Sequence, residues 1–334
     1  MNAANRGKKR IAWYRSPLAT ADLARLNQRS DRRGLTQALG HLALLAVSGG
    51  LAWHAAQHVH LFVALALITL HGALWAFLVN GFHELCHKTV FKTPALNSFF
   101  RNVYSFLGCY NHVSFWASHQ AHHRYTLHPP DDLEVVLPRE LTLRSYLSFA
   151  LVNPRGLWLR WKGILLLSLG RIDNDWERAL FPPEASEQRR KLFNWARALL
   201  FGHGLILAIS LWQGWYLLPI LTTLAPFYGG GFQFLLNEAQ HIGLSDEVSD
   251  YRLNTRTILL NPLLGFLYWQ MNYHIEHHMY AAVPFYHLAE LHRLVRADMP
   301  APARGVLGTW RQILPILRRQ QREPGYQFVP ELPV

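Results

Sequence analysis

The sequence predicts an all-α integral membrane protein, with four transmembrane helices in two hairpins and a cytoplasmic helical cap that holds a His-rich di-metal site. Three observations predict this class of protein. Only 16% of the 334 residues are charged, whereas a soluble domain carries about a quarter. The uncharged residues are concentrated in two long stretches, and several of the 19 histidines cluster where those stretches end. Cys86 and Cys109 are the two cysteines, too few for a disulfide framework.

Each charge-free stretch is long enough for a helical hairpin. No Asp, Glu, Lys or Arg occurs in the 50 residues between Arg33 and Glu84, nor in the 40 residues between Arg197 and Glu238. A helix needs about 20 apolar residues to cross the hydrocarbon core. The expected transmembrane helices are 36–56, 60–80, 197–213 and 216–236. Buried core helices of a soluble protein are the alternative, and four such segments joined by charge-free turns disfavour it.

The distribution of Lys and Arg predicts the orientation. Residues 1–34 hold nine Lys and Arg residues and the hairpin turns hold none, so the positive-inside tendency puts the N-terminus in the cytoplasm. With four crossings, the segment 81–196 and the chain after residue 237 lie on that same side. We expect a basic cytoplasmic segment over 1–34, a membrane domain over 35–300 and a cytoplasmic tail over 301–334, without a cleaved signal peptide. In a bacterium, the membrane is the inner or plasma membrane.

The remaining segments predict a cap on the membrane surface. The charge-free runs 102–123 and 257–275 are too short or too polar to span the bilayer and are interrupted by Gly or Pro, so we expect re-entrant or interfacial segments. The stretch 139–196 predicts surface helices and loops. Pro284 is placed to open an amphipathic helix.

Four clusters of candidate metal ligands begin where hydrophobic segments end. They are His83-Glu-Leu-Cys-His87, His119-Gln-Ala-His122-His123, Asn237-Glu-Ala-Gln-His241 and His274-Ile-Glu-His277-His278. Residues at i, i+3 and i+4 share one face of a helix, so each cluster would direct its imidazoles one way. Imidazole binds Zn, Cu, Fe and Ni, and one structural zinc takes four ligands. Nine histidines therefore indicate two metal ions, with Asn237 as a candidate tenth contact, direct or through water.

Acidic residues near the clusters are candidate partners for the rings. Metal-bound imidazole normally donates its other N–H group to a carboxylate or carbonyl. The candidates are Glu84, Glu238, Glu276, Asp131, Asp132 and Glu134. The three glutamates inside the clusters can equally face solvent. Ten histidines outside the clusters are expected to be interfacial, solvated or hydrogen-bonded. They are His41, His54, His58, His60, His71, His112, His128, His203, His287 and His292.

Over residues 35–300 the chain resembles the membrane fatty acid desaturase superfamily, which also contains related hydroxylases. The resemblance includes the four clusters, the two hairpins, Arg124-Tyr125-Thr126 after the second cluster and Asn272-Tyr273 before the last. It implies a non-haem di-iron centre that activates O2 and attacks an unactivated C–H bond. It also implies the ligands of the two iron ions. These are His83, His87, His119, His122, His123, His241, His274, His277 and His278, with Asn237 as a weaker candidate.

The chain departs from its apparent relatives in several places. The first cluster is HxxxH, not the longer HxxxxH of the animal acyl-CoA enzymes, so the substrate carrier is not inferred from them. Together with Lys88, this cluster is instead similar to the first cluster of membrane alkane hydroxylases. Gln240 stands where many relatives have Glu, and Met279-Tyr280-Ala281 stands where they often have a proline.

The resemblance also bears on the partners. No fused cytochrome-b5-like domain is visible, which implies a separate electron donor of the ferredoxin or cytochrome b5 type, with its reductase. The net charge of +12 suits an anionic membrane surface or an acidic partner, and no nucleic-acid partner is expected. Lys88, Lys92 and Arg124, beside the clusters, are candidate docking residues for the donor. Arg124 can instead pair with Asp131 or Asp132.

The expected function is membrane-bound, O2-dependent desaturation of an acyl chain in a lipid or fatty acid. Breaking an aliphatic C–H bond is beyond side-chain acids and bases, so no catalytic residue is expected beyond the metal centre. Hydroxylation or another monooxygenation of a fatty acyl, alkane or other lipophilic substrate is the alternative, because both reactions begin with removal of hydrogen. A metal transporter is a distant alternative, since transporters place ligands near the bilayer midplane. A non-catalytic scaffold would not need nine aligned histidines.

Overall fold

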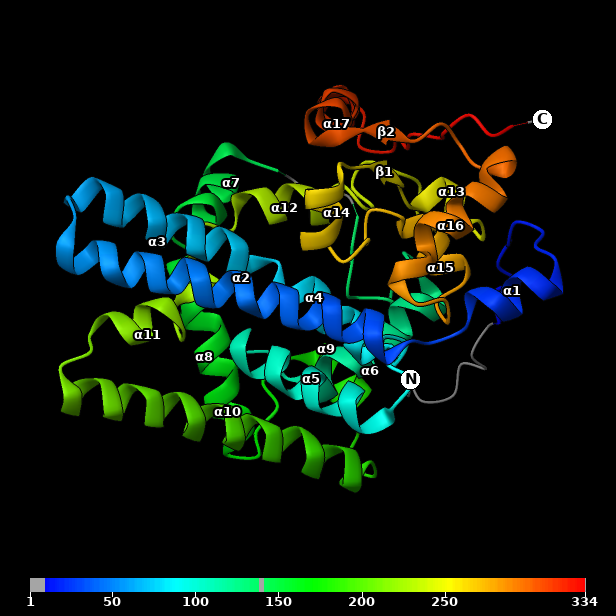
Figure 1. Cartoon of the computed structure of the whole chain (residues 1–334). Helices are drawn as coiled ribbons and strands as arrows, with labels where there is room; N and C mark the ends of the chain where they lie inside the picture. The colour runs from blue at the N-terminus through cyan, green and yellow to red at the C-terminus, as the bar shows by residue number, and fades with distance from the viewer. Residues whose placement is uncertain (1–9, 138–140, 334) are drawn as a thin grey trace.

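The computed structural model describes residues 10–137 and 141–333, which form a mostly helical protein (Figure 1). The helical character predicted from the sequence is confirmed. Two short strands, β1 (Ile258–Leu259) and β2 (Ala303–Arg304), pair in parallel. The first nine residues of the expected basic segment, and residue 334 of the expected tail, lie outside the described residues.

Three helices among the described residues are long and apolar enough to cross a membrane. They are α2 (Asp31–His58), the run Leu61–Cys86 made of α3 (Leu61–Ala76) and α4 (Leu78–Cys86), and α10 (Ser186–Gln213). α2 and α3 lie side by side and antiparallel (Figure 1). Large apolar side chains on these helices, such as Val47, Phe62 and Phe201, are exposed. Exposed apolar faces of this extent indicate contact with lipid.

All three helices extend beyond the predicted spans, and the run Leu61–Cys86 continues past residue 80. α2 begins at Asp31, because Ser30 caps it by accepting a hydrogen bond from the backbone N–H of Arg33. α10 begins at Ser186 rather than at 197, and its first turns carry the ion pair between Lys191 and Glu187 (2.7 Å). An i,i+4 pair of this kind stabilises a solvated helix. Charge therefore marks where the apolar part of α10 begins and not where the helix begins.

The prediction of a fourth continuous helix over 216–236 is wrong. There the chain forms α11 (Leu217–Leu221), the 3-10 turn η2 (Ala225–Phe227) and α12 (Gly231–Glu238). Pro219 and Pro226 lack the N–H group that a continuous helix needs, and Gly229 has a φ of +72°. A Cβ added at Gly229 would lie 2.6 Å from the carbonyl oxygen of Thr69 on α3. The segment therefore packs against α3 as short pieces.

Shorter helices lie between the long ones. They are α1 (Thr20–Leu26), α5 (Pro94–Leu107), α6 (His112–Tyr125), α7 (Leu143–Ala150), α8 (Pro154–Ser168) and α9 (Asp175–Leu180). The run 102–123 is divided between α5 and α6, with Gly108 at the break, as predicted. Asn111 caps α6 by accepting hydrogen bonds from the backbone N–H groups of Val113 and Ser114. These two hydrogen bonds fix the first turn of α6 and therefore the positions of the histidines that follow on it.

The C-terminal part of the cap consists of short helices and one long one. They are α13 (Tyr251–Asn254), α14 (Pro262–Leu267), α15 (His274–Met279), α16 (Phe285–Val295), the 3-10 turn η3 (Arg296–Asp298) and α17 (Gly305–Arg322). Pro284 is the N-cap of α16, as predicted. α17 lies within the expected tail 301–334, for which no helix is predicted. Its Trp310 is buried and donates a hydrogen bond to the carbonyl oxygen of Leu235 on α12 (3.1 Å).

A buried aromatic core fixes the position of α4. Tyr104 on α5 donates a hydrogen bond to the carbonyl oxygen of Ala38 on α2 (2.9 Å), and its ring packs edge-on against Trp269 (5.4 Å between centroids). A Cβ added at Gly81 on α4 would lie 2.5 Å from Tyr104 and 2.6 Å from Trp269. Glycine therefore permits α4 to approach both rings. This approach places His83, two residues later, against the cap.

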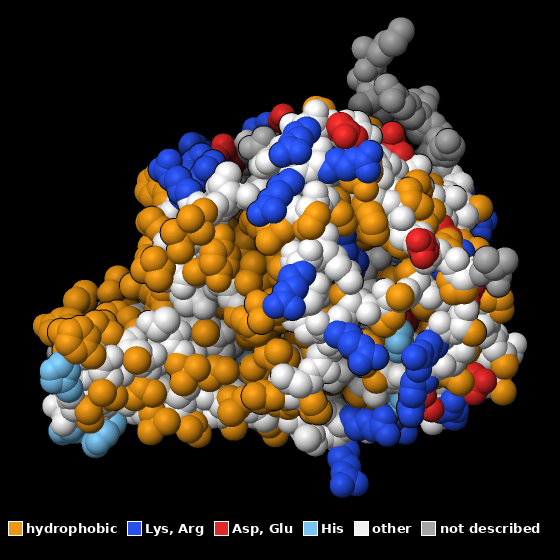
Figure 2. Space-filling view, turned by 90° about the horizontal axis from the view of Figure 1, so that it is seen from above, with side chains coloured by type: hydrophobic (Ala, Val, Ile, Leu, Met, Phe, Trp, Pro, Cys, Tyr) orange, Lys and Arg blue, Asp and Glu red, His pale blue; other side chains and the backbone are white. Residues whose placement is uncertain are grey.

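The surface has an apolar end and a charged end. In Figure 2, hydrophobic side chains cover the end formed by the α2–α3 hairpin, and Lys and Arg side chains lie over the cap. His54 and His58 are exposed near the C-terminus of α2, at the tip of the hairpin. This distribution is typical of a protein whose cap stands on the membrane surface.

We predict that the turn after α2 and the turn after α10 lie across the membrane from the cap. Cys86 and Cys109 are buried, so an introduced exposed cysteine can be labelled over a low background. In intact cells, a membrane-impermeant maleimide should label Gln57→Cys and Gln213→Cys but not Gln321→Cys on α17. Labelling of Gln321→Cys in intact cells would contradict this topology.

Candidate metal centre

Nine histidines converge from four segments of the chain at the cap end of the long helices. α4 and the residue after it contribute His83 and His87, α6 contributes three histidines, the turn after α12 contributes His241, and α15 contributes three. Within each segment the histidines share a helix face, as their spacing predicts. All nine histidines of the predicted clusters are therefore brought together.

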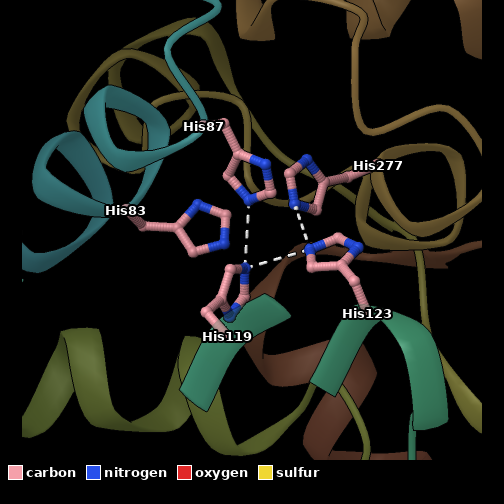
Figure 3. Close-up of side chains that lie close together, drawn as sticks. All are labelled: His83, His87, His119, His123 and His277. Carbon is pink, nitrogen blue, oxygen red and sulfur yellow. Dashed lines mark hydrogen bonds between the residues drawn. The ribbon is translucent and has the colours of Figure 1, made fainter. Parts of the chain in front are cut away.

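The nine histidines divide into two groups, and within each group one nitrogen from every ring lies within 4.8 Å of its counterparts on the other rings. The first group is His83, His87, His119, His123 and His277. The second group is His122, His241, His274 and His278. Figure 3 shows the first group, whose rings point toward one common centre. Every ring in the second group is buried.

The distances between facing nitrogens are those of ligands around one ion. In the first group, His119 Nε2 lies 3.0 Å from Nε2 of both His87 and His123. In the second group, His274 Nε2 lies 3.2 Å from His241 Nε2. Two nitrogens that are each about 2.1 Å from an ion lie about 3.0 Å apart when the angle at the ion is near 90°. The donor atoms and their spacing therefore fit two transition-metal ions.

Hydrogen bonds on the far side of the rings fix which nitrogen faces each centre. Nδ1 of His119 lies 2.7 Å from Oε1 of Glu134, and Nδ1 of His122 lies 2.8 Å from Oδ2 of Asp132. Nδ1 of His241 lies 2.8 Å from a backbone carbonyl oxygen. Because these oxygens accept, Nδ1 carries the proton and the lone pair of Nε2 points into the group. Facing lone pairs repel each other, and a cation between them removes the repulsion.

Burial keeps the imidazoles in the neutral form that binds metals. Loss of water around the charged form, together with repulsion from neighbouring imidazoles, holds five pKa values well below their ordinary value. These are the pKa values of His119, His123, His274, His277 and His278. A neutral imidazole keeps a lone pair for a metal ion.

The carboxylates predicted beside the rings lie in different places. Asp132 and Glu134 contact rings as described above, and Glu84 is buried with its Oε1 3.1 Å from Nδ1 of His83. Asp131 is exposed, and its neighbour Asp132 makes the contact with His122 instead. Glu238 is half-buried and lines a small cavity beside the second group.

Glu276 lies inside the last cluster, but its carboxylate contacts other residues. It is fully buried and accepts hydrogen bonds from Thr257 and from His292 on α16. The alternative that this glutamate faces solvent is therefore wrong. His292 is hydrogen-bonded, as expected for the histidines outside the clusters, and its contact ties α16 to the helix that carries three cluster histidines.

The small cavity beside the second group has a volume of about 220 Å³. Asn237, Asn80 and Met271 are among the residues that line it, together with His241. The amide of Asn80 donates a hydrogen bond to Oδ1 of Asn237 (3.3 Å). Asn80 is absent from the residues predicted for the site. Its position on α4, one turn before His83, is the signal that could have found it.

The family of the chain follows from comparison with known proteins. The family model described as "Fatty acid desaturase" matches residues 59–308, which are 250 of the 334 residues. The chain therefore belongs to the fatty acid desaturase family, and the match includes all nine histidines. A search of curated proteins finds no match. Membership in this family implies that the protein is a membrane-associated oxidoreductase that uses a metal centre.

We predict opposite outcomes for two adjacent substitutions, Asp132→Asn and Asp131→Asn. Asp132 is 0% exposed and accepts hydrogen bonds from His122 and from the backbone N–H of Leu127 and Glu134. An amide there offers a donor to a ring nitrogen that carries a proton. Asp132→Asn should lower metal affinity or activity about 10–100-fold, and Asp131→Asn should change neither. Equal metal content in the purified Asp132→Asn variant and the wild type, over a range of chelator concentrations, would contradict this role.

Proposed function

We propose that the protein is a membrane-bound, O2-dependent di-iron oxidoreductase that desaturates an acyl chain of a lipid or fatty acid. The observation that carries the proposal is the division of nine histidines into two adjacent groups in a chain of the fatty acid desaturase family. Iron suits imidazole ligands and, unlike zinc, changes oxidation state. When bound, two iron ions would supply the chemistry that uses O2 and electrons to break an aliphatic C–H bond.

In this proposal each histidine group holds one ion. His83, His87, His119, His123 and His277 hold the first, and His122, His241, His274 and His278 hold the second. Asn237, in the small cavity beside the second group, is a further contact, direct or through water. A catalytic metal site keeps a coordination position for substrate or water. The small cavity, which His83 and His119 of the first group line together with His122, His241 and His274 of the second, provides room for such a position.

The side chains around the groups hold the rings and exclude water. Phe115 stacks on the ring of His119 (5.0 Å between centroids, 13° between planes), and Phe82 packs against Phe115. Asp132 and Glu134 hold the Nδ1 protons, so that the rings keep one orientation. Because the groups lie at the cap end of the long helices, an acyl chain can reach them from the bilayer while a soluble donor approaches from the cytoplasm.

Hydroxylation of an acyl chain, an alkane or another lipophilic substrate is the second candidate function. The observation that favours it is the first cluster, His83 to Lys88, which is similar to that of membrane alkane hydroxylases. Both reactions begin with removal of hydrogen, and the position of the substrate decides between them. A metal transporter is disfavoured because both groups lie at the cap end of α4 and not at the middle of a long helix.

Lipid profiling of a host that expresses the protein tests the proposed function. Cells with the wild type should contain new double bonds in their acyl lipids, and the purified protein should hold iron at both histidine groups. His122→Ala should abolish the product, because the ligand set of the second group is then incomplete. His58→Ala, an exposed histidine at the hairpin tip, should be nearly neutral.

New hydroxyl groups in place of double bonds would favour the second candidate function. Purified protein that binds no iron, or a His122→Ala variant with full iron content and wild-type product, would show that the histidine groups are not the catalytic centre. The His58→Ala variant separates loss of the centre from a general effect of removing a histidine.

We further propose that the electrons come from a separate donor of the ferredoxin or cytochrome b5 type, with its reductase. Lys88, Lys92 and Arg124 are exposed in segments that directly follow cluster histidines. A basic surface beside the centre would attract an acidic donor, and salt would screen that attraction.

Charge reversal tests this docking surface. Lys92→Glu combined with Arg124→Glu should slow donor-dependent turnover about tenfold at low ionic strength, and less at high ionic strength. Turnover driven by hydrogen peroxide, in place of O2 and donor, should be unchanged because no docking is required. Equal losses with donor and with peroxide would mean that these side chains support the centre and not the partner.

A further inference from the structure

A larger cavity, with a volume of about 630 Å³, lies between α6 and the first turns of α10. The end of α4 and the side chain of Arg101 on α5 complete its walls. Its lining residues on α6 include Val113 and Ala117, which lie on a different face from His119 and His122. The volume is that of a site for a small molecule, since such sites enclose about 300–1,000 Å³.

The charged groups that line this cavity are all basic. Lys88, Arg101 and Lys191 line it, and no Asp or Glu is among the described residues that do. Lys191 pairs with Glu187 on the exposed side of α10 (2.7 Å). Arg101 is half-buried and donates hydrogen bonds to the neutral side chain of Asn102.

Arg101 is the residue that most needs an anion. Burial removes water from its guanidinium and lowers its pKa, and it has no ion-pair partner among the residues that the structure describes. A half-buried charge without a counter-ion is destabilised, and an anion within hydrogen-bonding reach offsets that cost. The cavity beside Arg101 is the space in which such an anion can lie.

The remaining walls are largely aromatic. Trp116 on α6, Trp195 on α10 and Phe181 line the cavity. The ring of Trp116 lies edge-on to the ring of His87, with 5.3 Å between centroids. One indole therefore separates the cavity from the first histidine group. Basic groups beside aromatic walls fit a ligand with an anionic head and a hydrocarbon chain.

We propose that this cavity binds the anionic headgroup of the acyl substrate, with Arg101, Lys88 and Lys191 contacting a carboxylate or phosphate. Trp116 and Trp195 contact the first carbons of the chain. The proposal rests on the proposed function for the statement that the ligand is the substrate. The shared chemistry is an anion at the end of an acyl chain, in a free fatty acid or in a phosphate ester. An alkane or a neutral alcohol lacks the anion that Arg101 requires.

A protein electron donor does not fit the same site. Arg101 is half-buried inside a cavity, where a small headgroup can reach it and the surface of a folded partner cannot. Lys88 is exposed at the cavity, whereas Lys92 and Arg124 do not line it. The headgroup site and the donor surface therefore share Lys88, whereas Arg101 and Lys191 belong to the headgroup site alone and Lys92 and Arg124 to the donor surface alone.

Equilibrium binding of three probes to the purified, metal-loaded protein in phosphatidylcholine nanodiscs tests the proposal. Dodecanoate, dodecyl phosphate and dodecanol share one hydrocarbon chain and differ in headgroup. The wild type should bind at least one anionic probe about tenfold more tightly than dodecanol. Arg101→Gln should remove this preference, and Arg101→Lys should retain most of it. Arg190→Gln, an exposed residue next to Lys191 on α10 but outside the cavity, should bind all three probes as the wild type does.

A preference for dodecanoate indicates a free fatty acid and a preference for dodecyl phosphate indicates a phosphate ester, and either supports the site. Equal binding of all three probes to the wild type, or equal losses for dodecanol and the anions in Arg101→Gln, would overturn it. If Arg101→Gln does not fold, the exposed Lys88→Gln tests the same preference. Binding is measured without turnover, so protein that prefers anions but forms no product would overturn the proposed function alone.

Discussion

Imidazole nitrogens that face one another at 3.0 Å in a buried site repel unless cations lie between them. α4, α6, the turn after α12 and α15 are far apart in the sequence, and the two histidine groups are the place where all four meet. This arrangement of neutral rings is stable only when two cations supply the positive charge that protons on the ring nitrogens would otherwise supply. Burial in turn prevents protonation from supplying those charges, because it disfavours the imidazolium form.

Two helices connect the groups to each other. α6 contributes two histidines to the first group and His122 to the second, and α15 contributes His277 to the first group and two to the second. Adjacent residues on a helix point about 100° apart, which is why His122 and His123 enter different groups. The distance between the two histidine groups is therefore set by the geometry of one turn of α6 and one turn of α15. A displacement of either helix would alter both ligand sets together.

The sequence predicts the parts of this site that depend on local periodicity, and misses those that depend on tertiary packing. Helical spacing places the histidines of each cluster on one face, and charge-free length indicates α2 and α3. The division into groups of five and four depends on how α6 and α15 cross, which no local pattern encodes. Composition also fails over 216–236, because it counts charges and ignores the breaks that Pro219, Pro226 and Gly229 impose on the backbone. The contact of Glu276 with His292 likewise requires two helices to be placed first.

α6 is the element on which the centre and both cavities depend. One face carries His119, His122 and His123, and residues of the same helix line the small cavity. Val113 and Ala117 on another face line the larger cavity together with Trp116. Asn111 fixes its start, and Asp132 holds the loop at its end through the backbone N–H of Leu127. These contacts fix α6 at both ends. Trp116 on this helix lines the larger cavity and lies edge-on to the ring of His87, so one side chain joins the cavity to the first histidine group.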